Sequence, residues 1–304
     1  MAASDSPASV LVVSSQVARG AIGARAAVFA LERLGLDCWL VPTVWMPWHP
    51  GHGRSTRLVP DADGFAAALE EIAESPAAAE IGTVVTGFFA QPAQIEAVAR
   101  AVERLRLLTP GLRLVVDPVI GDGQALYVPI AVAEALRDRL LPLADLATPN
   151  LFEAGWFSGR PVTTTAETVA AARALAPPTV VVTSAPALMT RSHATLLVTA
   201  DAATQIEHPK IDDAAHGTGD LVTALVAGRL ALGQPLEAAV TRAVTSVFEI
   251  VARSARAGAD ELRLAAEQDV LLHPMAQVSV RRIGEARSDH RRATVRPVAF
   301  DRSS

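Results

Sequence analysis

The feature that most constrains the fold is the alternation of short β-rich runs with longer segments of helical period. The β-rich runs lie at residues 9–15, 36–44, 81–87, 112–118 and 179–184, and the helical segments at 22–35, 61–75, 92–108, 129–142 and 165–176. This alternation is typical of a parallel sheet with helices on both faces. Residues 193–209 break it, because two alternating runs flank "TADAAT" and predict an antiparallel hairpin at one sheet edge.

The remaining chain predicts one domain. Three helical segments, Gly219–Leu232, Pro235–Ser254 and Asp260–Leu271, follow the hairpin. We find no repeat of fixed period and no linker rich in Pro, Gly or Ser. We therefore expect a single α/β domain over residues 1–280, followed by a basic, poorly ordered tail at 281–304.

Charge and cysteine content exclude several functions. A formal net charge of −5 argues against nucleic-acid binding, which needs a clustered surplus of Lys and Arg. Cys38 is the only cysteine, so the chain can form neither an intramolecular disulfide nor a thiolate metal cluster. A single cysteine also favours a reducing compartment. The first residues lack a signal-peptide pattern, and no apolar stretch reaches the roughly 18 residues of a membrane span. We expect a cytoplasmic protein without membrane or nucleic-acid partners.

The segment "HGTGD", His216 to Asp220, precedes a long apolar helical run and suggests phosphoryl transfer. Free amides at a helix N-terminus attract anions, and Gly217 and Gly219 would let the backbone approach a phosphate. A carboxylate at Asp220 would repel a static phosphate, but it could accept a proton from an attacking hydroxyl. An ordinary Asp N-cap after a glycine turn explains the same residues, so the motif alone leaves both interpretations open.

Polar or aromatic residues recur at the carboxyl ends of the predicted strands, where open α/β sheets bind ligands. They are Ser15, Gly87, Phe88, Asp117, Thr183 and Ser184. Together they predict a crevice. The chain has neither GxxxxGK[ST] nor a GxGxxG after its first strand, so a P-loop or dinucleotide-binding fold is not expected.

The ordered set of motifs over residues 10–274 resembles the pyridoxal kinases of the ribokinase-like superfamily. The motifs are "SSQVARGAIGARAAVFALERLG", "TGFF", "VDPVIGDGQALYVP", "TPNLFEA", "VVVTS", "LLVTAD", "HGTGD" and "DELRLAAEQD". The resemblance implies a three-layer sandwich and phosphorylation of the 5'-hydroxymethyl group of pyridoxal, pyridoxine or pyridoxamine by ATP and Mg²⁺. It also implies a homodimer, and it leaves a monovalent cation open as a further cofactor.

The resemblance assigns roles to individual residues. Asp220 would be the catalytic base, with Gly217, Thr218 and Gly219 as the anion hole. Asp117 and Glu153 would organise Mg²⁺, directly or through water. The remaining implied contacts are Asp117, Tyr127, Asn150, Glu153, Thr183 and Ser184 for ATP, and Ser15, Val17, Thr43, Met46, His49 and Phe88 for the substrate.

Departures from the family pattern concern the substrate side. Gln16 replaces a common His, Ala24 replaces an Asn after the matching glycine, Phe88 replaces a Tyr, and Pro50 replaces a Thr. "HGTG" also resembles hydroxymethylpyrimidine kinases, although those usually carry Cys at the position of Asp220. Two alternatives therefore stay open: a kinase for hydroxymethylpyrimidine or another hydroxymethyl heterocycle, and a catalytically quiet protein that binds pyridoxal or nucleotide.

Overall fold

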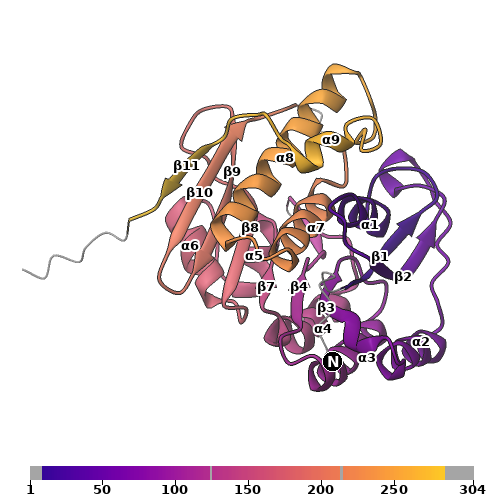
Figure 1. The fold of residues 1–304 in the computed structure, drawn as a ribbon. Helices are drawn as coiled ribbons and strands as arrows, with labels where there is room; N and C mark the ends of the chain where they lie inside the picture. Colours follow the sequence, from indigo (N-terminus) through magenta and orange to yellow (C-terminus); the bar gives the residue numbers. More distant parts are fainter. Residues whose placement is uncertain (1–8, 124, 213–214, 285–304) are drawn as a thin grey trace, which may run out of the picture.

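The computed structural model describes residues 9–123, 125–212 and 215–284. A central sheet of nine strands has the order β11-β10-β9-β8-β7-β4-β3-β1-β2 (Figure 1). Its strands are β1 (Ser9–Val17), β2 (Cys38–Met46), β3 (Ile81–Thr86), β4 (Arg113–Val116), β7 (Leu146–Ala147), β8 (Thr179–Ala185), β9 (Ser192–Thr199), β10 (Ala203–Pro209) and β11 (Ser279–Arg282). A separate two-stranded ribbon pairs β5 (Gly121–Asp122) with β6 (Ala125–Leu126).

Strands β2, β1, β3, β4, β7 and β8 pair in parallel, whereas β9, β10 and β11 continue the sheet in antiparallel pairs. The predicted mostly parallel sheet with an antiparallel edge hairpin is thus confirmed. The hairpin is β9–β10, with Ala203 opposite Val198 and Pro209 opposite Ser192. In Figure 1 the antiparallel strands lie at one side of the sheet, and β1 and β2 lie at the other.

Helices cover both faces, so the structure has three layers. They are α1 (Ala24–Arg33), α2 (Ala62–Glu74), α3 (Pro92–Leu108), α4 (Ile130–Ala135), α5 (Leu151–Ser158), α6 (Thr165–Ala174), α7 (Thr218–Ala231), α8 (Leu236–Arg256) and α9 (Gln268–Leu272). Short helical turns lie at Pro50–His52, Ala78–Glu80 and Leu141–Leu143, and a π-helical turn at Leu136–Leu140 continues α4. One core joins α1, α7, α8 and α9 to the sheet, and another joins α2, α3 and α4 to the opposite face.

The alternation of β1 residues explains the two cores. Val10 and Val12 pack in the first core, whereas Leu11 and Val13 pack in the second. Successive side chains of a strand point to opposite faces, so a strand buried on both sides reads as a continuous apolar run. Helix α7 is buried through most of its length, from Leu221 to Arg229, as its apolar sequence predicts.

Two predicted boundaries were wrong. Residues 260–267, expected to begin a helix ending at Leu271, form turns and loop, and only Gln268–Leu272 is helical. The backbone amide of Arg263 is held by the Ser254 side chain at 3.0 Å, a contact that helical periodicity does not encode. Arg281 and Arg282, assigned to the tail, instead pair with β10 as part of β11. Residues 285–304 of the predicted tail lie outside the described residues.

None of the helices in the described ranges combines the length and hydrophobicity needed to cross a bilayer.

Candidate active site

The N-terminus of α7 forms the floor of the candidate site. Gly217 is the N-cap, with φ of 90°, a conformation that L side chains rarely adopt. A Cβ at this residue would lie 2.2 Å from the backbone oxygen of Ala21, so glycine is also needed for close approach to the loop after β1. The first amides of α7 lack intrahelical acceptors. This floor can therefore bind an anion.

Asp220 lies in the first turn of α7 and does not cap the helix. Its carboxylate instead accepts hydrogen bonds from the backbone amides of Gly23 and of Asp220 itself. Burial raises the pKa of Asp220 to about 6, while these two amides oppose the rise. The interpretation of Asp220 as an ordinary N-cap is therefore wrong, because Gly217 occupies the N-cap position.

Asp117 follows β4 and lies beneath the same floor. Its side chain is 6% exposed, and burial, followed by the charges of Glu153 and Asp220, raises its pKa well above the usual range. Thr223, one turn along α7 from Gly219, donates to Asp117 Oδ2 at 3.3 Å. The Thr223 and Thr148 hydroxyls are 2.7 Å apart. Two buried threonines thus link this carboxylate to β7 and α7.

Asn150 and Glu153 form a capping box at the start of α5, which the sequence analysis did not predict as a helix. Glu153 Oε2 accepts the Asn150 amide at 2.8 Å, and Oε1 accepts the Ile120 amide at 3.0 Å. The Asn150 side chain donates to the Gly121 carbonyl at 2.8 Å. The pair therefore holds the loop after β4 in place, and burial raises the pKa of Glu153 to about 7.

These residues meet in one cavity of about 780 Å³. It brings together most of the residues predicted to bind ligands: Ser15, Met46, His49, Phe88, Asp117, Tyr127, Asn150, Glu153, Thr183, Ser184, Gly217, Thr218, Gly219 and Asp220. Val17 and Thr43 do not line it. Val17 is fully buried beside Val44 and Met46, and the Thr43 hydroxyl donates to the Phe88 carbonyl at 2.6 Å. These two residues support the cavity wall from behind.

Phe88 and His49 mark the end of the cavity formed by β1, β2 and β3. The His49 ring lies against the ring of His216, with centroids 4.6 Å apart. The Gly51 amide donates to His49 Nδ1 at 3.1 Å, which favours the neutral ring with its proton on Nε2. Burial, followed by the neighbouring His216, lowers the pKa of His49. Sequence reasoning did not assign His216 to the pocket.

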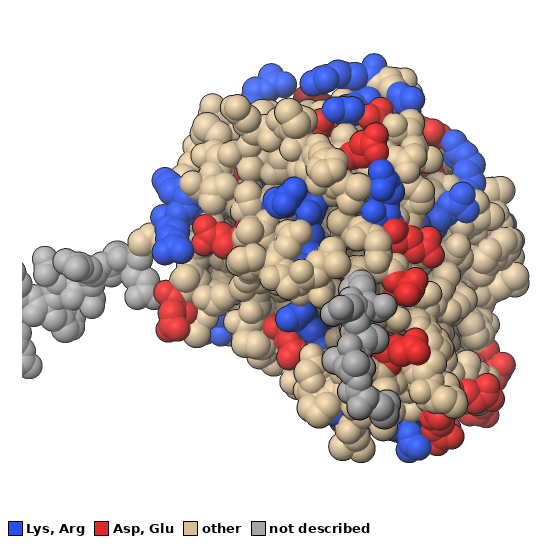
Figure 2. All heavy atoms as spheres, viewed as in Figure 1, with Lys and Arg blue, Asp and Glu red and all other residues tan. Residues whose placement is uncertain are grey.

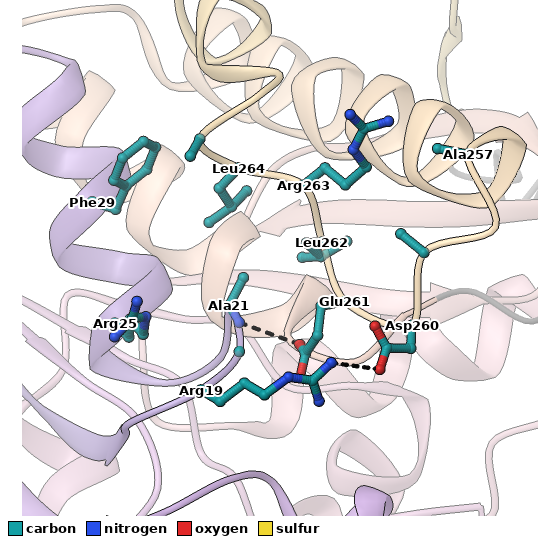
Figure 3. A pocket seen from close by; sticks show the side chains of 13 residues that line it. Arg19, Ala21, Arg25, Phe29, Ala257, Asp260, Glu261, Leu262, Arg263 and Leu264 are labelled. Carbon is teal, nitrogen blue, oxygen red and sulfur yellow. Dashed lines mark hydrogen bonds and ion pairs between the residues drawn. The ribbon is translucent and has the colours of Figure 1, made fainter.

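A second cavity, of about 750 Å³, lies on the other side of the loop after β1 (Figure 3). Glu261 reaches from the α8–α9 connection and accepts the Ala21 amide at 3.2 Å, while its other oxygen pairs with His52 Nε2 at 2.8 Å. Arg19 pairs with Asp260 at 2.7 Å beside it. These contacts attach both substrate-side loops to the C-terminal part of the chain.

Thr183, Ser184 and an aromatic surface line the opposite end of the cavity. Ser184 has φ of 54°, an uncommon value for a residue other than glycine, at an irregularity between β8 and β9. His208 stacks on Phe248 with centroids 4.6 Å apart. Sequence reasoning missed His208, His193 and Phe248. The hairpin pattern contained a signal for the two histidines, because His193 and His208 are direct cross-strand partners.

Three carboxylates that line the cavity, Asp117, Glu153 and Asp220, suit a divalent cation held by few protein ligands. Burial raises the pKa of Asp117, Glu153 and Asp220, and the charges of Glu153 and Asp220 raise that of Asp117 further, which indicates an excess of negative charge. In the described part of the chain, no group of three or more His, Cys, Asp or Glu side chains is arranged as a complete metal site. Mg²⁺ usually keeps several waters and binds one or two carboxylates plus substrate phosphates, so this arrangement fits it.

Charges are mixed on the face drawn in Figure 2, where Lys and Arg alternate with Asp and Glu. The described residues of this face form no broadly acidic patch, whereas Asp117, Glu153 and Asp220 gather in the cavity.

Comparisons with known proteins agree with this geometry. The sequence profile of the phosphomethylpyrimidine kinase family matches residues 57–264. A pyridoxal kinase from Rubrobacter xylanophilus is 34% identical over 285 residues, which cover 90% of this chain and 97% of the relative. A pyridoxine/pyridoxal/pyridoxamine kinase from Bordetella bronchiseptica is 38% identical over 269 residues, covering 85% and 94%.

A solved pyridoxal kinase from Leishmania donovani, in complex with ADP and pyridoxamine, superposes with a TM-score of 0.85 and 28% identity. The match covers 90% of this chain and 99% of that one. Sequence, fold and site geometry lead to one conclusion: this chain is a member of the pyridoxal kinase family within the ribokinase-like superfamily.

Proposed function

We propose that this protein transfers the γ-phosphoryl group of ATP to the 5'-hydroxymethyl group of pyridoxal, pyridoxine or pyridoxamine. The observation that carries the proposal is the convergence of Asp220 and the Gly217–Gly219 backbone on the floor of one cavity. Its two ends have different chemistry. Phe88 and His49 line one end, where a flat heteroaromatic ring could stack, and Thr183 and Ser184 line the other, where phosphates could bind.

In the proposed reaction, Asp220 accepts the proton of the 5'-hydroxyl as its oxygen attacks the γ-phosphorus. The bond from that phosphorus to the β,γ-bridging oxygen breaks, and ADP leaves. The amides of Gly217, Thr218 and Gly219 hold the transferring group, since charge builds on its oxygens during such a transfer. A pKa of about 6 lets Asp220 be ionised at neutral pH and still accept a proton late in the reaction.

Asp117 and Glu153 would hold Mg²⁺ on the phosphate side. When bound, Mg²⁺ would neutralise charge on the phosphate oxygens. Asp117 is the better candidate for direct contact, because both Glu153 oxygens already accept backbone amides. Glu153 would then act through water and by fixing the loop at Ile120 and Gly121. Asn150 has the same supporting role through the Gly121 carbonyl.

Direct assays test the proposal. The purified protein would be given Mg²⁺ and ATP with pyridoxal, pyridoxine, pyridoxamine or hydroxymethylpyrimidine in separate reactions. Release of ADP together with a 5'-phosphate ester from the vitamin B6 compounds supports the proposal. ADP release with none of the four heterocycles would instead favour a catalytically quiet binding protein.

Hydroxymethylpyrimidine is the second candidate substrate. Two observations favour testing it: the profile that matches residues 57–264 is that of phosphomethylpyrimidine kinases, and His216 precedes the glycine turn and lines the cavity. A kcat/KM for hydroxymethylpyrimidine above that for every vitamin B6 compound would replace the first proposal with this one.

We further propose a cytoplasmic homodimer formed by a single kinase domain. Large apolar side chains remain exposed on β2 and the segment after it, which supports self-association: Leu40, Trp45, Trp48, Leu58 and Val59. The reducing compartment is supported by the single cysteine, Cys38, whose pKa is raised to about 12 by burial and which is therefore unreactive as a thiolate. Light scattering in solution would measure the mass, and a monomer would contradict the assembly.

A further inference from the structure

Arg57 is a cationic residue in the wall of the substrate end of the cavity. Its guanidinium carbon lies 6.0 Å from the ring centroid of Phe88, in the range of a cation–π contact. The substrate ring is expected to stack on this same Phe88. A charged substituent on the edge of that ring nearest Arg57 would therefore lie near the guanidinium, and in the proposal below the amine of pyridoxamine lies at this edge.

Among the residues that the structure describes, no carboxylate pairs with Arg57 within 4.0 Å. Its guanidinium faces the ring of Phe88 and acts electrostatically on His49. Glu261, which contacts the adjoining loop, is already paired with His52 at 2.8 Å and accepts the Ala21 amide. A guanidinium carries its positive charge throughout the neutral pH range.

Two histidines lie beside the guanidinium. His49 has a lowered pKa, with its Nδ1 accepting the Gly51 amide. His216 lies against the ring of His49. Arg57 is the one Lys or Arg among the described residues that line the cavity, so it is the one permanent positive charge there.

We propose that Arg57 is a specificity-determining residue that discriminates among vitamin B6 compounds by charge. The proposal rests on the kinase function proposed above. Pyridoxamine carries a primary alkylamine, which is protonated at neutral pH like a lysine side chain. Pyridoxal and pyridoxine carry an aldehyde or a hydroxyl at that ring position, so the guanidinium penalises pyridoxamine alone.

The test compares Arg57→Gln and Arg57→Lys with the wild type. The matched control is Arg54→Gln, because Arg54 is an exposed arginine of the same loop that does not line the cavity. Values of kcat/KM for pyridoxal and pyridoxamine would be measured at low and high salt. Arg57→Gln is expected to raise the pyridoxamine-to-pyridoxal ratio about fivefold, as for like charges several Å apart near a surface. Arg57→Lys and Arg54→Gln should keep the wild-type ratio.

High salt should bring the pyridoxamine-to-pyridoxal ratio of kcat/KM of the wild type closer to that of Arg57→Gln, since screening weakens interactions between exposed charges. The proposal is overturned if Arg57→Gln keeps the wild-type ratio, or if Arg54→Gln shifts it equally. A failure of the kinase function looks different, because then no vitamin B6 compound is phosphorylated by any variant. In that case calorimetry on the same proteins measures the dissociation constants of pyridoxal and pyridoxamine. If Arg57→Gln leaves the ratio of these two constants unchanged, the proposal is again overturned.

Discussion

The rings of His49 and His216 lie in contact, with centroids 4.6 Å apart, although 166 residues lie between them in the chain. His49 belongs to the loop after β2, and His216 directly precedes the glycine turn of α7. The contact therefore joins the loop after β2, at the substrate end of the cavity, to the turn that begins α7. A Cβ at Gly51 would lie 2.7 Å from His216 Nε2, which shows how closely the loop approaches.

Replacement of His216 should loosen the substrate loop. We expect His216→Ala to raise the KM for pyridoxal about threefold to tenfold, because a packed ring contact of this kind is lost. Steady-state kinetics with varied pyridoxal at saturating ATP measure the effect. The control is His273→Ala, an exposed histidine outside the cavity. An unchanged KM in His216→Ala would show that the ring contact does not hold the loop.

Replacement of Asp220 should abolish proton acceptance while keeping the fold. We expect Asp220→Asn to lower kcat by about 100-fold or more, as for the loss of a positioned base. ADP binding, measured by calorimetry, should stay close to wild type, since asparagine can still accept the Gly23 amide. The unfolding temperature at neutral pH should not fall, because the variant no longer buries an ionised carboxylate. Activity within a few fold of wild type would exclude Asp220 as the base.

The hydroxyl of Thr223 should help to keep the carboxylate of Asp117 ionised. Its hydroxyl bond lowers the pKa of Asp117 against the larger effect of burial. We expect Thr223→Val to weaken the apparent affinity for Mg²⁺ in the assay about threefold to tenfold, and Thr223→Ser to restore it. Thr245→Val is the matched control, because Thr245 is a buried helical threonine whose hydroxyl bonds only to Thr241 O, at 2.7 Å. Equal effects of the two valine variants would point to helix stability instead.

The acidic cluster should make stability depend on pH. The pKa values of Asp220 and Glu153 are raised to about 6 and about 7, and that of Asp117 is also raised, by burial and then by the charges of Glu153 and Asp220. The folded protein thus keeps protons that the unfolded chain has already released. The stability that these groups contribute is present at about pH 4 and is lost as the pH rises through about 7.

Asp117→Asn removes one titrating member of this cluster. We expect the free energy of unfolding of the wild type without nucleotide to fall relative to this variant as the pH rises above the ordinary Asp pKa of about 4. Urea unfolding at several pH values measures the difference, and Mg²⁺ with ADP should reduce it. Parallel pH curves for the two proteins would contradict the pKa shift of Asp117.

A comparison of alanine variants at Gly217 and Gly233 distinguishes the effect of a steric clash from that of a positive φ. Both have positive φ, 90° and 75°, but a Cβ at Gly217 would meet the Ala21 oxygen whereas one at Gly233 would meet nothing within 4 Å. We expect Gly217→Ala to lower kcat/KM about 100-fold, because the floor must shift away from the loop after β1. Gly233→Ala should cost only about 1 kcal/mol of stability and keep activity. Similar activities for both variants would show that the floor tolerates the displacement.

The sequence by itself determined the sheet and the chemistry of its carboxyl edge. Periodicity within β1 and α7 is a local property, so the parallel strands, the hairpin and the buried helix could be predicted. The residue types of His216–Asp220 likewise indicated an anion site with a base. The same five residues could not distinguish a helix cap from a catalytic carboxylate, because that depends on which partner the side chain meets.

Tertiary structure alone decided those partners. It placed Gly23 against Asp220, Arg57 over Phe88 and the Glu153 oxygens on the loop at Ile120. It also kept residues 260–267 out of a helix, so that Glu261 reaches His52 and Ala21. Such contacts join segments far apart in the chain, and they depend on packing between layers, which no local pattern of residues records. For that reason the reaction class can be inferred from the sequence, whereas the charge next to the substrate ring follows only from the fold.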